Sequence, residues 1–264
     1  MSKDWTKTRA KVKDFIETEI YPKETELSKG TPEAREMLGS LMQLAKDEKI
    51  WALGHPEDIG GGGMPFMEYV YVNEVIGRSS FAMVALGTHS LQDSIMLREF
   101  ASPHWRDQYL EPLVQGEIFP SFGMTEPDVA SSDPTQLQTT AILDNGTWKI
   151  NGRKWFTTGA ARAAYTTVMC RTELDAPSHG AFSMIIVPTD NPGYKIIRET
   201  PVLGINGGHY EVEYDNVEVP EENLLGPRGQ GFIIAQRRLG PGRIFHCMRL
   251  SLIHISEPTR LAEI

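Results

Sequence analysis

The chain has 264 residues, of which 40% are hydrophobic and 23% charged, and its formal net charge is −9. This length suits roughly two domains. The acidic balance argues against a nucleic-acid-binding protein, although a local arginine cluster could still bind a phosphate-bearing ligand. The N-terminus lacks an apolar signal core, no run of about 18 apolar residues occurs, and the two cysteines form no C-x-x-C pair. We expect a cytoplasmic protein with free thiols and no membrane span.

Helical periodicity dominates the first 118 residues. Apolar side chains recur at the spacing of one helix face from Val12 to Ile20. Thr31-Pro32-Glu33 is typical of a helix start, with a capping hydroxyl before a proline. Further helices are expected over residues 66–78, 81–100 and 103–115. The sequence therefore predicts an all-helical domain over residues 1–118.

From about residue 119 the hydrophobic pattern takes the shorter period typical of β-strands, and β-branched residues, aromatic residues and turn signals become more frequent. Asp144-Asn145-Gly146-Thr147 predicts a hairpin turn, and Asn151-Gly152 predicts another. Strands are expected over residues 139–143, 148–150, 165–171, 181–187, 194–198, 209–214 and 217–219. The overall class is α+β: helices first, then a mostly antiparallel β-barrel or sheet domain over residues 119–228.

Helical spacing returns after Gly231, and residues 229–250 are expected to start a C-terminal helical domain. Pro241 should kink that helix, delay it or lie in its first turn. In residues 251–264, Pro258 should interrupt any helix.

Two segments of the β-region could contact a ligand. Residues 121–133 are rich in hydroxyl side chains, which with backbone amides could bind phosphate or ring oxygens, but a plain polar connection with Asx and Ser/Thr turns fits as well. In residues 151–160, Trp155 and Phe156 should point to opposite faces of a strand. One could then present its flat side to a planar ligand, or both could be ordinary core and rim residues.

Two later segments are also ambiguous. Residues 226–231 are glycine-rich, but they lack the G-x-G-x-x-G spacing and favour a flexible lead into a helix. The three arginines of residues 237–246 could bind a phosphorylated ligand or form a solvated face. Neither a metal-ligand spacing nor a G-x-S-x-G motif is present.

Taken together, four segments resemble the acyl-CoA dehydrogenase family, and in particular the subgroup that contains the human family members ten and eleven. Residues 124–132 resemble the family's T-E-P motif at the start of the flavin loop, and residues 151–159 resemble its second flavin strand. Leu203-Gly204 with residues 217–220 resembles the end of its β-domain, and residues 239–249 resemble the helix that follows.

The resemblance implies an N-terminal helical domain, a middle β-domain with flavin-binding loops and a C-terminal helical bundle. It implies FAD as cofactor, with Phe122, Met124, Thr125, Phe156 and Thr158 near the flavin ring. Ser131 would lie by the FAD pyrophosphate or the CoA moiety, and the acyl-CoA substrate would also contact Gly240, Pro241, Gly242 and Arg243. No metal is implied.

The implied reaction, as in fatty acid β-oxidation, is α,β-dehydrogenation of an acyl-CoA thioester, with an electron-transferring flavoprotein as acceptor and a homo-oligomer as the full-length enzyme. No catalytic base is assigned, because Gly242 occupies one of the family's two positions for it and Glu126 suits a structural role. We also expect the chain to be truncated before the bundle and its FAD affinity and turnover to be weak. The atypical tail over residues 251–264 is interpreted as a foreign or misread end, with a genuine short variant as the alternative. A non-catalytic acyl-CoA or flavin binder and a related oxidase or flavin monooxygenase are the alternatives.

Overall fold

The computed structural model describes residues 5–202 and 208–261, with side chains up to residue 250. The chain divides into two compact units, Met1–Ile95 with Arg238–Ile264, and Met96–Arg237. The expected features at residues 203 and 204 lie outside the described residues. Among the described helices, none is at once long and apolar enough to cross a bilayer.

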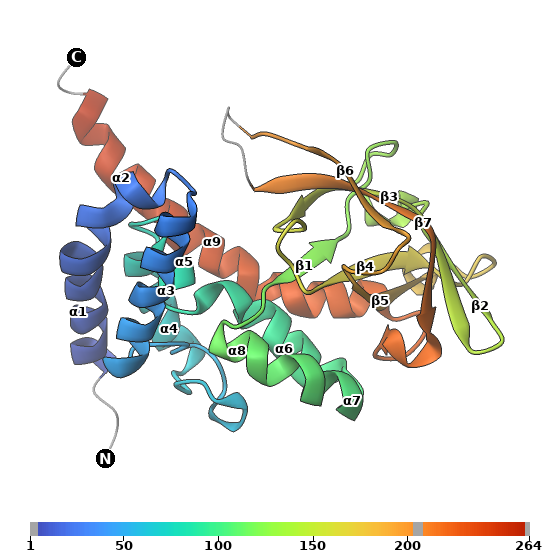
Figure 1. Ribbon diagram of the computed structural model, residues 1–264, viewed down its shortest axis with the longest axis horizontal. Coiled ribbons are helices and arrows are strands. Elements are labelled where there is room, and N and C mark those ends of the chain that lie inside the picture. The colour runs from blue at the N-terminus through green and yellow to red at the C-terminus, as the bar shows by residue number, and fades with distance from the viewer. Residues whose placement is uncertain (1–4, 203–207, 262–264) are drawn as a thin grey trace. The chain divides into compact units, whose positions relative to one another are not determined.

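The first unit is helical (Figure 1). Thr31 caps α3 as expected, because its Oγ1 accepts a hydrogen bond from the amide of Ala34 at 3.3 Å. The unit contains α1 (Trp5–Phe15), α2 (Glu24–Leu27), α3 (Pro32–Asp47), α4 (Phe66–Ile76), α5 (Ala82–Ala85) and the start of α6 (Leu91–Phe100). Single helical turns of other types occupy Ile16–Ile20, Tyr21–Lys23, Glu57–Ile59 and Thr88–Ser90.

The single helix expected over residues 81–100 is wrong. It is broken into α5 and α6 at Gly87, whose φ is 71°. Only glycine adopts this left-handed conformation readily, and a Cβ at this position would lie 2.8 Å from the Trp51 ring. The break depends on the glycine and on its close contact with Trp51, and helical periodicity reveals neither.

The second unit consists of a mixed sheet and the helices before it (Figure 1). Its strands are β1 (Pro120–Gly123), β2 (Thr140–Asp144), β3 (Thr147–Thr158), β4 (Tyr165–Arg171), β5 (Phe182–Pro188), β6 (Tyr194–Glu199), β7 (His209–Pro220) and β8 (Leu224–Leu225). The strand order is β6-β7-β3-β2-β4-β5-β8, with β1 paired to β4. The β1–β4 and β2–β4 pairs are parallel and the others are antiparallel.

The two expected hairpin turns had different outcomes. Asn145 and Gly146 both have positive φ, 49° and 78°, and join β2 to β3 as a tight antiparallel hairpin. Asn151-Gly152, by contrast, lies inside β3, where the ladder to β7 shifts register between Ile150 and Gly152. Asn151-Gly152 is therefore not a turn: it lies within a 12-residue strand, opposite a β-bulge whose extra residue is on β7.

The sheet encloses an apolar core, and short helices cover its other side. Trp148, Ile150 and Val217 lie in this core, to which six strands, β2 to β7, contribute buried side chains. On the helical side, α7 (Pro103–Trp105), a turn over Arg106–Leu110 and α8 (Glu111–Gln115) precede the sheet, and the Tyr109 ring stacks on Tyr165 at 4.6 Å. Single turns at Pro134–Gln136, Ser178–Gly180 and Glu221–Asn223 connect strands. β4 and β5 are buried on both faces, which explains why charged residues are nearly absent from both strands.

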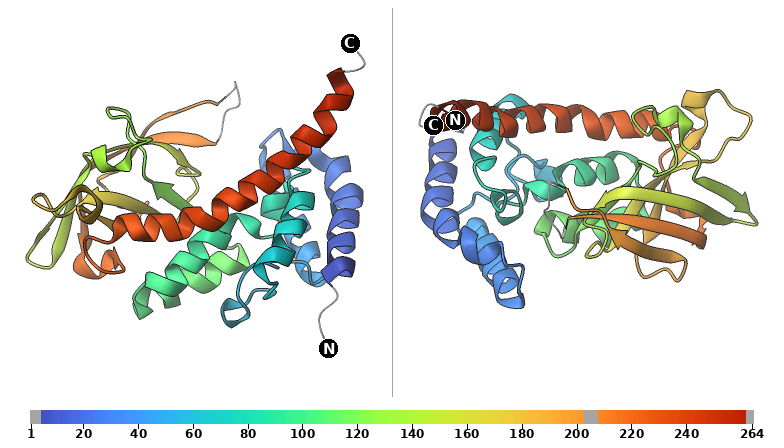
Figure 2. Two further views of the ribbon diagram at one scale, coloured as in Figure 1. Left: turned by 180° about the vertical axis from the view of Figure 1, so that it is seen from behind. Right: turned by 90° about the horizontal axis from the view of Figure 1, so that it is seen from above.

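The last helix, α9 (Gly231–Leu261), is longer than expected (Figure 2). Pro241 neither delays the start of the helix nor lies in its first turn, because α9 begins ten residues earlier, at Gly231. The backbone is also helical at Pro258, so the expectation that this proline ends the helix is wrong. Each proline lacks the N–H that a helix interior normally uses, which removes one ladder bond per proline.

Candidate functional site

Strand β1 alternates between a buried and a half-buried face. Ser121 and Gly123 are buried, whereas Phe122 and Met124 are half-buried. The parallel pairing with β4 fixes this orientation, since Phe122 is opposite Thr167. Two of the side chains predicted to contact a flavin thus share one face of β1.

The loop after β1 is organised by a buried carboxylate, Glu126. Its Oε1 accepts from the Lys154 ammonium at 2.7 Å and from the Thr139 amide at 2.9 Å, and its Oε2 accepts from the Gln138 amide at 2.7 Å. The Ser131 hydroxyl accepts from the Glu126 amide at 2.8 Å and donates to the Glu126 carbonyl at 3.0 Å. Ser131 therefore closes the loop on itself, and Glu126 is buried and paired, in keeping with a structural role.

Strand β3 carries an irregularity where the aromatic pair lies. Its ladder to β7 shifts register between Lys154 and Thr157, which leaves Trp155 and Phe156 outside the regular pairing. Phe156 has a φ of 48°, a left-handed conformation that is costly for a bulky residue, and its side chain is 41% exposed. The expected opposite orientation of the two aromatics is wrong: their ring centroids are only 4.9 Å apart, because the bulge breaks the alternation.

Thr158 lies just beyond the bulge and is exposed. Its Oγ1 is 2.9 Å from Nδ1 of His209, its neighbour across the β3–β7 ladder. The His209 ring also approaches the Phe156 ring edge-on, at 6.2 Å between centroids. The histidine therefore orients the threonine hydroxyl beside the exposed aromatic.

Side chains and backbone join the β1 end to the bulge of β3. The Trp155 amide donates to the Thr125 carbonyl at 3.0 Å, and the Thr125 hydroxyl donates to the Trp155 carbonyl at 2.8 Å. Thr125, Phe156 and Thr158 are thus gathered at one junction instead of scattered. An exposed aromatic in strained backbone, flanked by hydroxyls, suits a planar ring with polar edges such as a flavin.

The predicted substrate residues lie on α9, within the first unit. Gly242 is buried, and a Cβ there would lie 2.2 Å from Nε2 of Gln92. Gly240 and Pro241 are half-buried and Arg243 is exposed. Of the three arginines in this segment, Arg238 pairs with both oxygens of the buried Asp93 at 3.1 and 3.0 Å, so it serves the interior of its own unit.

The sequence interpretation missed Lys154 and His209. Lys154 is fully buried, on the same face of β3 as Trp148 and Ile150. Period-two alternation from these residues could have found it, because a charged residue at an inward position requires a partner. His209 had no comparable signal, because its role depends on the β3–β7 register.

Burial and pairing control the electrostatics of this region. Burial by itself would raise the pKa of Glu126, but the Lys154 ammonium and the amide donors outweigh it, and the pKa lies below its usual 4.5. Burial raises the pKa of the nearby Cys170 thiol to about 12. The anionic form of Glu126 is therefore favoured, and Cys170 stays a neutral thiol.

Comparison with known proteins identifies the family. Residues 2–117 match the acyl-CoA dehydrogenase N-terminal domain and residues 121–217 match its middle domain. FadE2 of Mycobacterium tuberculosis, assigned as an acyl-CoA dehydrogenase, is 44% identical over 220 residues, 81% of this chain and 53% of its own length. Human acyl-CoA dehydrogenase family member 11 is 37% identical over 260 residues, 90% of this chain and 33% of its own length. The chain thus spans about half the length of FadE2 and about a third of member 11.

Solved structures agree with this assignment. A Mycobacterium abscessus protein assigned as an acyl-CoA dehydrogenase superposes with a TM-score of 0.87 at 36% identity, covering 94% of this chain and 66% of the other. An acyl-CoA dehydrogenase from Geobacillus kaustophilus gives 0.77 at 25% identity, covering 94% and 65%. The helical unit, the mixed sheet with its T-E-P loop and the helix that follows thus recur together, and the chain belongs to the acyl-CoA dehydrogenase family.

Proposed function

We propose that this chain forms part of an FAD-dependent acyl-CoA dehydrogenase, which oxidises the bond between the α and β carbons of an acyl-CoA thioester. The observation that carries the proposal is the bulge of β3, which holds Phe156 exposed in left-handed backbone beside Thr125 and Thr158. Such strain is retained at functional surfaces more often than in ordinary strands. When bound, FAD would supply the electron acceptor of the reaction.

The cofactor-binding residues we propose are Phe122, Met124, Thr125, Ser131, Phe156 and Thr158. The half-buried face of β1 and the exposed Phe156 would contact the flat ring, because aromatic and apolar side chains pack on ring faces. Thr158, with its hydroxyl oriented by His209, would hydrogen-bond to a ring edge. Ser131 would lie beside the phosphates of FAD or of CoA.

The acyl-CoA substrate would also contact Gly240, Pro241, Gly242 and Arg243 on α9. The exposed guanidinium of Arg243 suits a CoA phosphate, and the absence of a side chain at Gly242 allows close approach of other groups. An electron-transferring flavoprotein would accept the electrons, and the whole enzyme would be a homo-oligomer. Both partners follow from family membership.

A second candidate, a non-catalytic acyl-CoA or flavin binder, is favoured by one observation. Glu126 is the buried carboxylate at the site, and it is saturated by Lys154 and two backbone amides, so it is not free to accept a proton from carbon. Gly242 has no titratable side chain. We assign no catalytic base among the residues that the structure describes.

Anaerobic titration tests the proposal. FAD fluorescence during titration with the 264-residue chain measures the affinity, which we expect to be weak, and loss of the visible flavin band on adding acyl-CoA measures reduction. Binding without bleaching by any chain length supports the non-catalytic candidate. Oxygen consumption after bleaching would indicate an oxidase. No FAD binding by the wild-type chain would overturn the cofactor assignment.

A further inference from the structure

Strands β1 and β3 lie side by side without sharing a backbone ladder. β1 pairs with β4, whereas β3 pairs with β2 and β7. The space between them is bridged by individual bonds instead, and we call this region, residues 121–126 and 154–158, the β1–β3 seam. Ser121 Oγ donates to the Thr158 carbonyl at 2.9 Å, and the Thr125 and Trp155 bonds described above cross the same gap.

The Lys154 side chain extends from β3 across the seam through the buried interior. Its ammonium donates to the Met124 carbonyl at 3.0 Å and to Glu126 Oε1 at 2.7 Å. The Lys154 side chain is 0% exposed and that of Glu126 is 4% exposed. Since Glu126 also accepts from the amides of Gln138 and Thr139, one buried ion pair connects β3 to both ends of the loop that follows β1.

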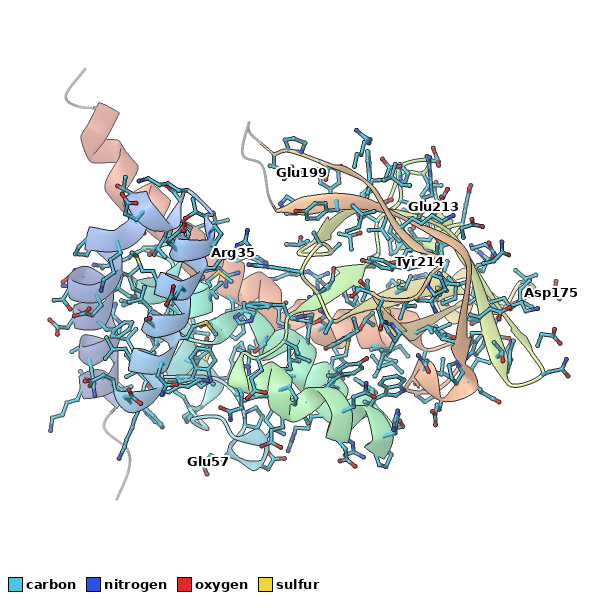
Figure 3. The ribbon with its side chains drawn as sticks, in the orientation of Figure 1. Arg35, Glu57, Asp175, Glu199, Glu213 and Tyr214 are labelled. Atoms are coloured by element: carbon cyan, nitrogen blue, oxygen red, sulfur yellow. The ribbon has the colours of Figure 1, made fainter. Side chains whose placement is uncertain are left out.

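Close packing restricts how β1 can move relative to the Lys154 side chain. A Cβ on Gly123 would lie 3.1 Å from the Tyr214 hydroxyl and 3.4 Å from Lys154 Cγ, so β1 rests directly on these side chains. Figure 3 shows Tyr214 inside the β-region. The stem of Lys154 therefore sets how closely β1 approaches, and its ammonium sets the position of Met124.

A buried ion pair is weak evidence for stability, because desolvation offsets much of the attraction. Its better attested effect is to specify one geometry, since charged groups in a dry interior must meet their partners. Here one partner is the Met124 carbonyl, Glu126 directly follows Thr125, and Lys154 directly precedes Trp155. These are the same residues that shape the two halves of the proposed ring-binding surface.

We propose that Lys154 and Glu126 are positioning residues that fix the separation of the β1 and β3 halves of this surface, and so its affinity for a planar ring. The inference rests on the proposed function for the identity of the ring. The hydrogen bonds and the ion pair that hold the seam are independent of it. Loss of the ion pair should increase the mobility of the seam residues even in variants whose sheet stays folded.

The experiment compares K154M and E126Q with two controls. K195M removes an exposed pair on β6 and β7, in which Lys195 and Asp215 are 2.6 Å apart. V217A truncates a core side chain opposite Ile150 on β7, away from the seam, and lowers stability without touching it. Each variant is measured below its melting transition by peptide-resolved hydrogen exchange and by FAD fluorescence titration.

For K154M and E126Q we expect amide exchange in the peptides that contain Trp155 and Gln138-Thr139 to accelerate, and the FAD dissociation constant to rise, each by about tenfold or more. K195M and V217A should stay within about twofold. Should K154M not fold, E126Q carries the test, because it keeps the side-chain shape and removes only the charge.

Two results separate the hypotheses. If folded K154M or E126Q keeps wild-type exchange at the seam and wild-type FAD affinity, or if V217A weakens FAD equally, the pair is an ordinary core interaction and the inference is wrong. If wild-type protein binds no FAD at all, the proposed function fails, while the exchange rates still decide whether the pair holds the seam.

Discussion

Two ion pairs of the same sheet have nearly equal lengths and opposite surroundings. Lys154 and Glu126 are 2.7 Å apart inside the seam, and Lys195 and Asp215 are 2.6 Å apart on the outer edge formed by β6 and β7. The inner side chains are at most 4% exposed, whereas the outer ones are 47% and 48% exposed. Distance alone would rank the two pairs as equals.

The difference shows that burial, not length, decides what an ion pair does. Water screens the outer pair and solvates either partner if the other is removed. The inner charges have only each other and a few backbone groups, so removal of one leaves the other unsatisfied. The inner pair can therefore specify geometry, and the outer pair cannot.

The largest effect should come from breaking the inner pair. K154M should destabilise the protein by about 3–5 kcal/mol, because it leaves the Glu126 carboxylate buried without its cation. K195M should leave the unfolding free energy nearly unchanged. Urea unfolding followed by circular dichroism measures both, and a K154M midpoint close to that of K195M would contradict the comparison.

The two ion pairs should also differ in how strongly protein stability depends on pH in the acid range. The pKa of Glu126 is lowered in the folded state, so its stabilising contribution is present above its usual value of about 4.5 and is lost as the pH falls through the folded-state pKa. Urea midpoints measured from neutral pH downward should therefore fall less steeply in E126Q than in wild type. D215N should hardly alter the slope, although Lys195 also lowers the pKa of Asp215, because water screens that pair. Equal slopes in E126Q and wild type would show that Glu126 does not contribute.

Single bonds across the seam should have intermediate effects. S121A and T125V each remove one hydroxyl donor to a β3 carbonyl, which should cost about 1 kcal/mol apiece. T18V is a matched control, since its hydroxyl bonds only to Asp14 within its own helical turn. Thermal unfolding midpoints rank the three variants. If T18V lowered the midpoint as much as T125V, bonds across the seam would contribute no more stability than a bond within one helical turn.

The smallest change in stability should follow F156G. Glycine relieves the left-handed backbone, a gain of about 1 kcal/mol that offsets the lost packing of a half-exposed ring. FAD affinity should nevertheless fall, because the proposed ring contact is gone. N145G, at a left-handed position in the turn between β2 and β3, is the control and should leave FAD titration unchanged.

Much of the sheet could be predicted from the sequence because its signals are local. Asn145-Gly146 specifies a tight turn by its own conformational preference, and β4 and β5 are predicted from short stretches rich in β-branched and apolar residues. The α+β class and the family motifs followed from such signals. Asn151-Gly152 misled because the same residue types occur both in turns and inside strands, and here the irregular backbone lies on the partner strand β7.

The site was less accessible to prediction because it depends on register. The contact between Trp155 and Phe156 arises from a ladder shift opposite β7, and the role of His209 arises from its pairing with Thr158. The helix break at Gly87 likewise depends on Trp51, 36 positions earlier in the chain. These features involve residues that are distant in sequence, which periodicity within one segment cannot relate.

The two cysteines offer a practical consequence of the buried sheet core. Cys170 lies in the sheet core with a thiol pKa raised to about 12, whereas Cys247 is exposed on α9. A maleimide dye should therefore label the native chain at one helix position without any substitution. The second thiol becomes reactive only when the sheet opens, so a second label shows that the sheet of that molecule has opened at least once.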